Sequence, residues 1–201
     1  ITNNEVHHNG DVGIFVRSMT DSARDVIHDV YIADNVVHHN DGDPNKTYQH
    51  TGNGILLGST DGGVIENNEA YENGAGNTYQ YGGPVGIWAW NSQNIVIQFN
   101  ESHHNRTSSW DGAGFDLDGG VINSVMQYNY SHNNDGAGYL IAQYPSAPDM
   151  YNNVIRYNIS ENDGRNRGYG GIHLWRAADT VMRDIYIPVS YTHLTLPTNG
   201  T

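Results

Sequence analysis

Cysteine is absent from this chain of 201 residues, which excludes disulfides and thiolate chemistry. Cations are also scarce, since Lys46 is the only lysine, the eight arginines form no cluster, and the formal net charge is −13. Nucleic-acid binding needs cations that neutralise phosphates, so we expect no nucleic-acid partner. An acidic polysaccharide would also be repelled unless a cation such as Ca²⁺ bridged it, whereas a neutral glycan would not. No apolar run is long enough to cross a bilayer, so we expect no membrane insertion.

Glycine and asparagine are abundant, with 24 and 25 copies. The 14 tyrosines, the four tryptophans and the many β-branched residues argue against disorder. This mixture is typical of many short strands joined by tight turns.

A repeat of about 30 residues runs through most of the sequence. Its marker is an Asn followed five positions later by a second Asn or an Asp, and the first Asn recurs at intervals of 29 to 33 residues. The copies are Asn4/Asn9, Asn35/Asn40, Asn68/Asn73, Asn100/Asn105, Asn129/Asn134 and Asn158/Asp163.

Each marker lies between apolar segments whose residues alternate with a period of two, which excludes a helical repeat. A short apolar strand comes before it and a strand that begins with Gly comes after it, as in Gly54-Ile-Leu-Leu57 and Gly86-Ile-Trp-Ala89. One such unit cannot bury its own apolar face, so successive coils must stack about 4.8 Å apart. Stacking places Asn on Asn, and we expect a ladder of amides that hydrogen-bond from coil to coil.

This pattern resembles the right-handed parallel β-helix repeat of the pectin-lyase-like superfamily over about residues 1–187. The resemblance implies an all-β solenoid of about six coils, truncated at both ends, from a secreted or cell-surface protein that handles carbohydrate. The Asn-Thr-Asp, Gly-His-Gly and Arg-x-Lys motifs of its polygalacturonases are absent, as is the Trp-Ile-Asp-His segment of its pectate lyases. No catalytic residue can therefore be carried over from those enzymes.

The pattern stops at Val189. Residues 189–198 read Val-Ser-Tyr-Thr-His-Leu-Thr-Leu-Pro-Thr, which resembles the translation of a transposase end sequence used to prepare DNA libraries. We therefore predict two regions, a β-helix fragment over 1–187 and a non-native tail over 188–201. The alternative is a natural terminal β-segment.

Alternation within the Gly-led strands predicts which side chains face outward. The first outward column is Phe15, Leu56, Trp88, Asp116, Leu140 and His173. The second is Arg17, Gly58, Trp90, Asp118, Ala142 and Trp175. We expect these columns to form one exposed sheet face.

Asp116 and Asp118 are the candidate catalytic pair, with His173 as a third functional side chain. Two positions along a strand separate their backbones by about 6.7 Å, and two nearby carboxylates raise one pKa, which gives an acid beside a base. That spacing favours inverting over retaining glycoside hydrolysis. The alternative is a solvated strand face, or a pair that caps the turn at Gly119 and Gly120.

Flat aromatic side chains suit sugar rings, so we predict that tryptophans bind substrate. They are Trp88, Trp90 and Trp175, with Trp110 as a wall of the cleft and Arg17 beside them. The alternative for Trp88 and Trp90 is packing beneath the long loop at 74–85.

A column of histidines follows the Asn ladder, at His7, His38, His103 and His132. Stacked imidazoles can share a metal ion, but a repeat also copies residues for structural reasons. The sequence therefore leaves a metal site unknown. Ca²⁺ remains a possible cofactor.

Three functions fit these features. The first is a glycoside hydrolase that acts on a neutral or weakly charged polysaccharide or oligosaccharide. The second is a polysaccharide lyase that uses an Arg base and Ca²⁺, with Arg17, Arg106 and Arg176 as candidates. The third is a non-catalytic adhesin, carbohydrate-binding scaffold or stalk. An enzyme should gather Asp, His and Trp around one cleft, whereas a stalk should spread them evenly.

Overall fold

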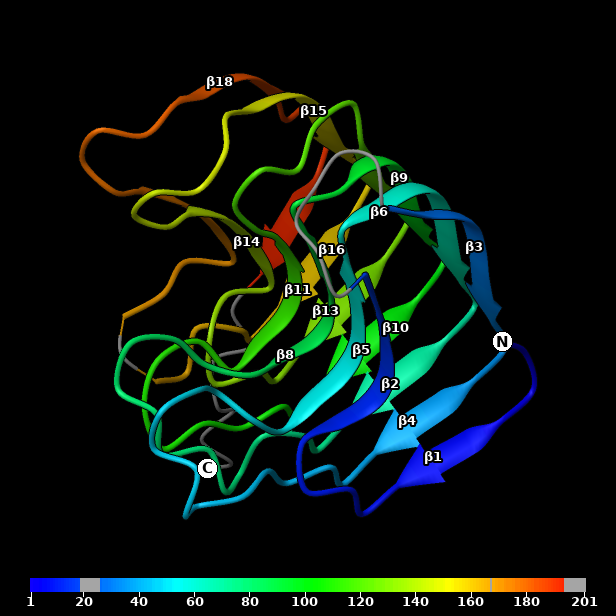
Figure 1. The fold of residues 1–201 in the computed structure, drawn as a ribbon, viewed down its shortest axis with the longest axis vertical. Helices are drawn as coiled ribbons and strands as arrows, with labels where there is room; N and C mark the ends of the chain where they lie inside the picture. The colour runs from blue at the N-terminus through cyan, green and yellow to red at the C-terminus, as the bar shows by residue number, and fades with distance from the viewer. Residues whose placement is uncertain (19–25, 167, 194–201) are drawn as a thin grey trace, which may run out of the picture.

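A computed structural model describes residues 1–18, 26–166 and 168–193 of the chain. In this part the backbone winds through about six coils of three parallel strands each, and then enters one more strand (Figure 1). The described residues contain no helix. The predicted all-β parallel β-helix of about six coils is confirmed.

Strands of the same position in successive coils pair into three parallel sheets. The first sheet contains β1 (Glu5–His7), β4 (Val36–His38), β7 (Glu69–Tyr71), β10 (Glu101–His103), β13 (Tyr130–His132), β16 (Ile159–Glu161) and β19 (Tyr191–His193). The second contains β2 (Val12–Arg17), β5 (Asn53–Gly58), β8 (Val85–Trp90), β11 (Ala113–Leu117), β14 (Tyr139–Gln143) and β17 (Ile172–Arg176). The third contains β3 (Ile27–Ala33), β6 (Thr60–Glu66), β9 (Gln93–Gln98), β12 (Val125–Gln127), β15 (Met150–Arg156) and β18 (Met182–Tyr186).

The core fills the space between the three sheets. Strand alternation sends one side chain of every two inward, and stacking then brings like residues together. Ile55, Ile87, Phe115 and Tyr139 pair in register along the second sheet and are fully buried. The rings of Phe115 and Tyr139 stack with centroids 5.2 Å apart. These inward side chains lie on the face opposite the predicted outward columns.

Two asparagine ladders hold the coils in register. In the first, each side-chain amide donates to the Oδ1 of the next Asn at 2.8–3.1 Å, from Asn4 to Asn158. The second runs from Asn9 in the same way and ends on the carboxylate of Asp163. From Asn35 and Asn40 onward these amides are buried, so each bond satisfies polar atoms that would otherwise cost about 1–3 kcal/mol to bury. The predicted ladder is confirmed.

A glycine stands at the second position of a strand of the second sheet, or directly before it, where neighbouring coils approach closely. A Cβ on Gly54 would lie 2.3 Å from the carbonyl oxygen of Gly86, and one on Gly86 would lie 2.1 Å from Ser102 Oγ. Only glycine fits such a contact. The glycine therefore lets neighbouring coils approach closely at the start of the strand that carries the outward columns.

The segment that follows the repeat continues the first sheet. Tyr191–His193 forms β19, which pairs in parallel with β16, and Val189 accepts a backbone hydrogen bond from Tyr157. Residues 194–201 lie outside the described residues. The non-native origin of 188–201 stays a prediction, since an added parallel strand can form from any extended segment at an open edge.

Candidate functional site

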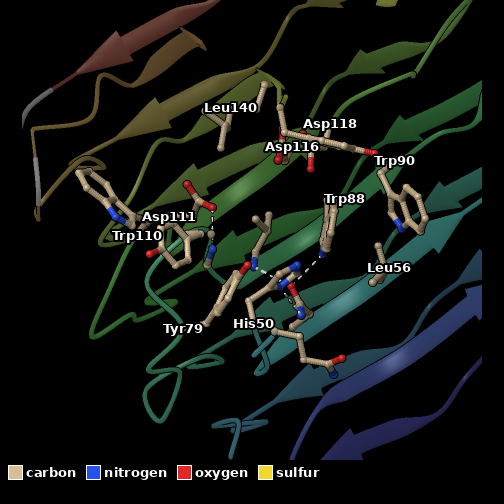
Figure 2. A pocket seen from close by; sticks show the side chains of 18 of the residues that line it. His50, Leu56, Tyr79, Trp88, Trp90, Trp110, Asp111, Asp116, Asp118 and Leu140 are labelled. Atoms are coloured by element: carbon tan, nitrogen blue, oxygen red, sulfur yellow. Dashed lines mark hydrogen bonds between the residues drawn. The ribbon is translucent and has the colours of Figure 1, made fainter. Parts of the chain in front are cut away.

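A cavity of about 870 Å³ lies over the outer face of the second sheet. Strands β2, β5, β8, β11, β14 and β17 all contribute side chains to it. The loop residues His50 and Tyr79 form part of its walls (Figure 2). Tyr169 also lines it. Its volume falls in the range that small-molecule and oligosaccharide sites occupy. The eight side chains predicted as functional all line this one cavity: Asp116, Asp118, His173, Trp88, Trp90, Trp175, Trp110 and Arg17.

The pairing of the strands explains why these residues meet. Phe15, Leu56, Trp88, Asp116, Leu140 and His173 occupy one register position in six successive strands. The second column is also in register where strands pair, as at Gly58 with Trp90 and at Ala142 with Trp175. Because the side-chain period of a strand is two, both columns face the same side of the sheet.

The expectation of an exposed sheet face is wrong for the middle coils. Leu56, Trp88, Asp116 and Leu140 are each no more than 4% exposed, because loops fold over them. Trp110 and Trp175 remain about half exposed, at 45% and 46%. The cleft thus has a buried floor and open aromatic edges.

Trp88 is held in the floor by a polar contact. Its Nε1 donates to Asn53 Oδ1 at 3.0 Å, and the same oxygen accepts from the backbone of Val85 at 3.1 Å. The ring of His50 lies 5.5 Å from that of Trp88, and burial lowers the pKa of His50. A buried indole with its N–H satisfied is rigid, so Trp88 fixes the shape of the cavity and offers little free surface to a ligand.

Trp90 lies against the sheet because its neighbour in the preceding coil, Gly58, has no side chain. A Cβ on Gly58 would lie 2.5 Å from the indole Nε1 of Trp90. The Arg17 guanidinium lies 5.0 Å from the centroid of the same ring, a cation–π contact. Together these contacts hold Trp90 as a flat wall of the cavity.

Asp116 is a buried carboxyl group in the floor. Its Oδ1 has no hydrogen-bond partner. Burial, with smaller contributions from Asp118 and Asp111, raises its pKa well above the usual range. Burial of this kind favours the protonated form of the carboxyl group.

Asp118 follows at the end of the same strand. Burial, with a smaller contribution from Asp111, raises its pKa to about 7, although the Gly119 N–H donates to its Oδ1 at 2.7 Å and favours the ionised form. The turn-capping contact proposed as the alternative from the sequence is therefore present. It coexists with a pKa that suits a general acid.

Asp111 is a third carboxyl group of the cavity, which the sequence reasoning missed. Its Oδ2 accepts from the Gly83 N–H at 2.8 Å, and its Oδ1 accepts from the Tyr169 hydroxyl at 2.8 Å. Two donors stabilise a carboxylate. Burial and Asp111 both raise the pKa of Tyr169, so its hydroxyl keeps the proton that it donates.

His173 lines the cavity beside Tyr169. Its ring lies 5.0 Å from that of Tyr169, and its Nδ1 is 3.4 Å from the Gly170 backbone nitrogen. His173 therefore backs the tyrosine that orients Asp111. One signal for Asp111 was available in the sequence, its place directly after Trp110 in a long loop over the strands.

Over residues 1–184 the sequence matches the family described as "Right handed beta helix region". The chain belongs to this family. The right-handed β-helix inferred from the repeat is thereby confirmed.

Two solved structures share the fold. Both are described as GH136 lacto-N-biosidase from Eubacterium ramulus, one a selenomethionine derivative with a TM-score of 0.59 and the other the native protein with a TM-score of 0.51. Each is 20% identical to this chain, and each alignment covers 88% of this chain and 31% of the other. The chain thus spans about a third of the length of these structures. No curated protein matches the sequence.

No helix in the described part of the chain is long and apolar enough to span a bilayer.

Proposed function

We propose that this β-helix region carries the active site of a glycoside hydrolase that acts on a neutral or weakly charged glycan. The observation that carries the proposal is a titratable acid, Asp118, with a pKa of about 7 in a cleft walled by tryptophans. Glycosidases pair a protonated carboxyl group with a second carboxylate across the scissile bond. The likeness to a lacto-N-biosidase in fold is consistent with this chemistry.

We assign the general acid to Asp118. At neutral pH a substantial share of Asp118 is protonated, and the proton can pass to the oxygen of the leaving sugar. The Gly119 N–H then stabilises the carboxylate that remains.

Asp111 is the better partner for Asp118 than Asp116. The partner must be ionised to activate water or to stabilise positive charge at the anomeric carbon. Asp111 has two hydrogen-bond donors on its carboxylate, whereas Asp116 is buried with one oxygen unpartnered and a strongly raised pKa. Asp116 would instead act as a neutral donor toward the substrate. The prediction of an inverting mechanism rested on the Asp116–Asp118 spacing and does not apply to the pair Asp111 and Asp118.

The aromatic side chains would bind the sugar rings. Trp90, Trp110 and Trp175 offer accessible indole surface, and Trp88 shapes the floor. Arg17 is occupied on Trp90, and it is the one arginine among the residues that line the cavity. A lyase would need an arginine or similar group as its base. Its acidic substrate would be repelled by the three carboxyl groups of the cavity unless a cation bridged them, so hydrolysis is favoured over elimination.

The proposal is tested with a panel of neutral oligosaccharides that includes lacto-N-biosides, with uronic-acid polymers as the lyase arm. Products are followed by reducing-end release and by absorbance of unsaturated sugars. We expect hydrolysis of a neutral glycan, abolished in Asp118→Asn and Asp111→Asn and unchanged in Asp29→Asn, an exposed aspartate on β3. Binding without turnover would favour the non-catalytic scaffold, and unsaturated products would favour the lyase.

A further inference from the structure

A column of imidazole rings lies on the first sheet, a different sheet from the one beneath the cavity. His7, His38, Tyr71, His103 and His132 occupy one register position in successive strands. Their rings stack with centroid distances of 4.6–5.1 Å. The proposed hydrolase makes no use of these side chains.

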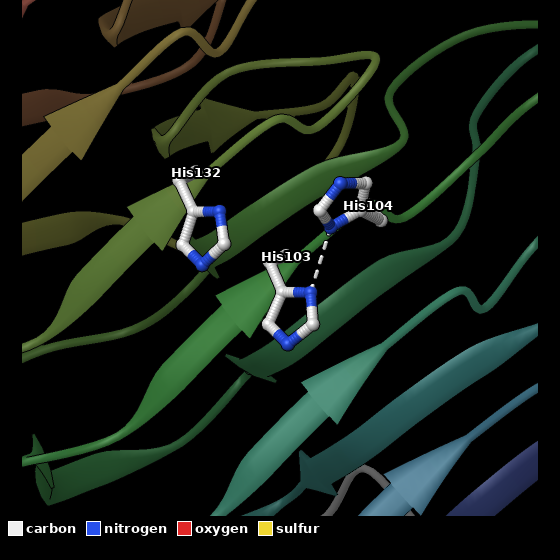
Figure 3. A group of neighbouring side chains, drawn as sticks. All are labelled: His103, His104 and His132. Atoms are coloured by element: carbon white, nitrogen blue, oxygen red, sulfur yellow. Dashed lines mark hydrogen bonds between the residues drawn. The ribbon is translucent and has the colours of Figure 1, made fainter.

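Three histidines of this region converge on one point. They are His103 on β10, His104 directly after it, and His132 on β13 (Figure 3). One ring nitrogen from each lies within 4.8 Å of the others. Within residues 1–18, 26–166 and 168–193, no other group of three histidine or acidic side chains brings its ligand atoms this close.

The backbone creates this convergence. His103 and His132 come from successive coils and stack nearly parallel, at 4.6 Å and 9°. His104 has a left-handed φ of 54°, which turns its ring edge-on to both, at 87°. Such a φ is uncommon for a residue other than glycine. The Nδ1 atoms of His103 and His104 are 2.8 Å apart.

Glutamate carboxylates contact two of the rings at the Nε2 atom. His103 Nε2 lies 3.1 Å from Glu69 Oε1, and His132 Nε2 lies 2.9 Å from Glu101 Oε1. An ionised glutamate draws the ring proton to Nε2, which leaves the lone pair on Nδ1. Metal-binding histidines are oriented by carboxylates in this way.

The surrounding charges favour a cation. Glu69 and Glu101 contact the rings, Glu72 lies near His104, and Arg106 is the nearby positive group. Imidazole binds metal in its neutral form.

We propose that His103, His104 and His132 bind one divalent cation of the Zn²⁺ class, with water completing its coordination. Three neutral imidazoles suit Zn²⁺, Ni²⁺ or Cu²⁺, whereas Ca²⁺ and Mg²⁺ prefer oxygen ligands. The ion joins the fourth and fifth coils. It also anchors the start of the loop that carries Trp110 and Asp111, six and seven residues after His104.

The same chain supplies an internal comparison. His38 and His39 repeat the close Nδ1 contact, at 2.7 Å. In the next coil, however, Tyr71 and Glu72 replace the His-His pair, and Glu72 contacts His39 Nε2 at 2.8 Å. This position therefore offers no third imidazole on its following coil. We expect weaker binding there.

The test is titration of the metal-free protein with Co²⁺, read by its visible absorption, followed by displacement with Zn²⁺. We expect one ion per chain with a Kd for Zn²⁺ below about 10 µM at pH 7.5. His104→Asn is the first variant, because Asn tolerates a left-handed φ, and we expect it to lose about 100-fold or more in affinity. His132→Gln should lose affinity similarly, while His28→Asn, on β3, and His39→Asn should retain the tight site.

A second readout is independent of any enzymatic activity. Zn²⁺ should raise the unfolding temperature of the wild-type protein and of His28→Asn but not of His104→Asn, because a ligand that binds only the folded state stabilises it. The proposal is overturned if His104→Asn binds Zn²⁺ as tightly as wild type, or if the wild-type Kd exceeds about 100 µM. Loss of the tight site in His39→Asn but not in His104→Asn would also overturn it.

Discussion

The Tyr169 hydroxyl donates a hydrogen bond to Asp111 Oδ1 at 2.8 Å, between residues 58 positions apart in the chain. The same hydroxyl oxygen accepts from the Asp111 backbone N–H at 3.2 Å. A loop of the sixth coil thus fixes a carboxylate carried by a loop of the fourth. The proposed active site is therefore assembled across coils.

Tyr169→Phe tests whether the Tyr169 hydroxyl holds the Asp111 carboxylate in position. The substitution keeps the ring and removes both hydrogen bonds to Asp111, so we expect turnover to fall by about tenfold or more and the fold to persist. The measurement is kcat on the best glycan of the panel, with circular dichroism to check folding. Tyr186→Phe, which changes an exposed tyrosine on β18, is the matched control and should leave kcat unchanged. Equal kcat in wild type and Tyr169→Phe would contradict a positioning role.

The raised pKa of Asp118 predicts that the free energy of unfolding depends on pH. Its pKa is raised from 3.8 to about 7 on folding, so the folded state binds a proton more tightly than the unfolded chain. Its contribution to the free energy of unfolding is therefore present at low pH and is lost as the pH rises from about 4 through about 7. Asp116, whose pKa is also raised by burial, acts with the same sign.

The measurement is urea unfolding of wild type and Asp118→Asn at pH 5 and pH 8. The gain in stability of the variant over wild type should be larger at pH 8 than at pH 5. His50 and His104, whose pKa values are lowered by burial, titrate with the opposite sign, but they do so equally in both proteins. An identical gain at the two pH values would show that Asp118 is not a raised-pKa group.

The asparagine ladder predicts a large loss in the free energy of unfolding when one buried amide is removed. Asn100 donates to Asn129 and to the carbonyls of Ile65 and Gln98, and its Oδ1 accepts from the backbone and side chain of Asn68. Asn100→Ala leaves these buried groups unpaired, so we expect a loss of about 2–4 kcal/mol in the free energy of unfolding.

Asn4→Ala is the comparison variant, because Asn4 is the exposed first member of the same ladder. Its loss should be below about 1 kcal/mol. Chemical denaturation of both variants gives the two values. Similar losses at Asn4 and Asn100 would mean that the ladder contributes through something other than burial of its amides.

Gly58→Ala tests the role of Trp90 in sugar binding separately from the role of Asp118 as general acid. The new Cβ would lie 2.5 Å from Trp90 Nε1, so the indole must move. We expect KM for the glycan to rise by about tenfold with a smaller change in kcat, because sugar binding is affected and proton transfer is not. Gly10→Ala, where nothing lies within 4 Å of the added Cβ, should change neither constant. A tryptophan fluorescence spectrum that matches wild type would show that Trp90 has not moved.

The periodic features could be predicted from the sequence. Side chains alternate along a strand and like residues stack between coils, so the repeat alone placed Trp88 beside Asp116 and gave the buried column through Phe115. The ladder followed in the same way from the spacing of Asn35, Asn68 and Asn100.

The burial and the third carboxyl group could not be predicted. Loops over the second sheet follow no period, so the sequence offered burial of Trp88 beneath a loop only as an alternative and gave no indication that Asp116 would be buried. Asp111 lies in such a loop and is fixed by a tyrosine two coils away. The His103–His104–His132 cluster depends on how closely three ring nitrogens approach one another, which a pattern of repeats does not reveal.

The most direct test of the hydrolase proposal is the pH profile of kcat/KM for wild type and Asp118→Asn on a glycan that the protein cleaves. We expect an alkaline limb near pH 7 in wild type, the pH at which Asp118 loses its proton, and about 1% or less of wild-type turnover in the variant. Wild-type turnover in Asp118→Asn, or a rate that does not fall above pH 7, would contradict it.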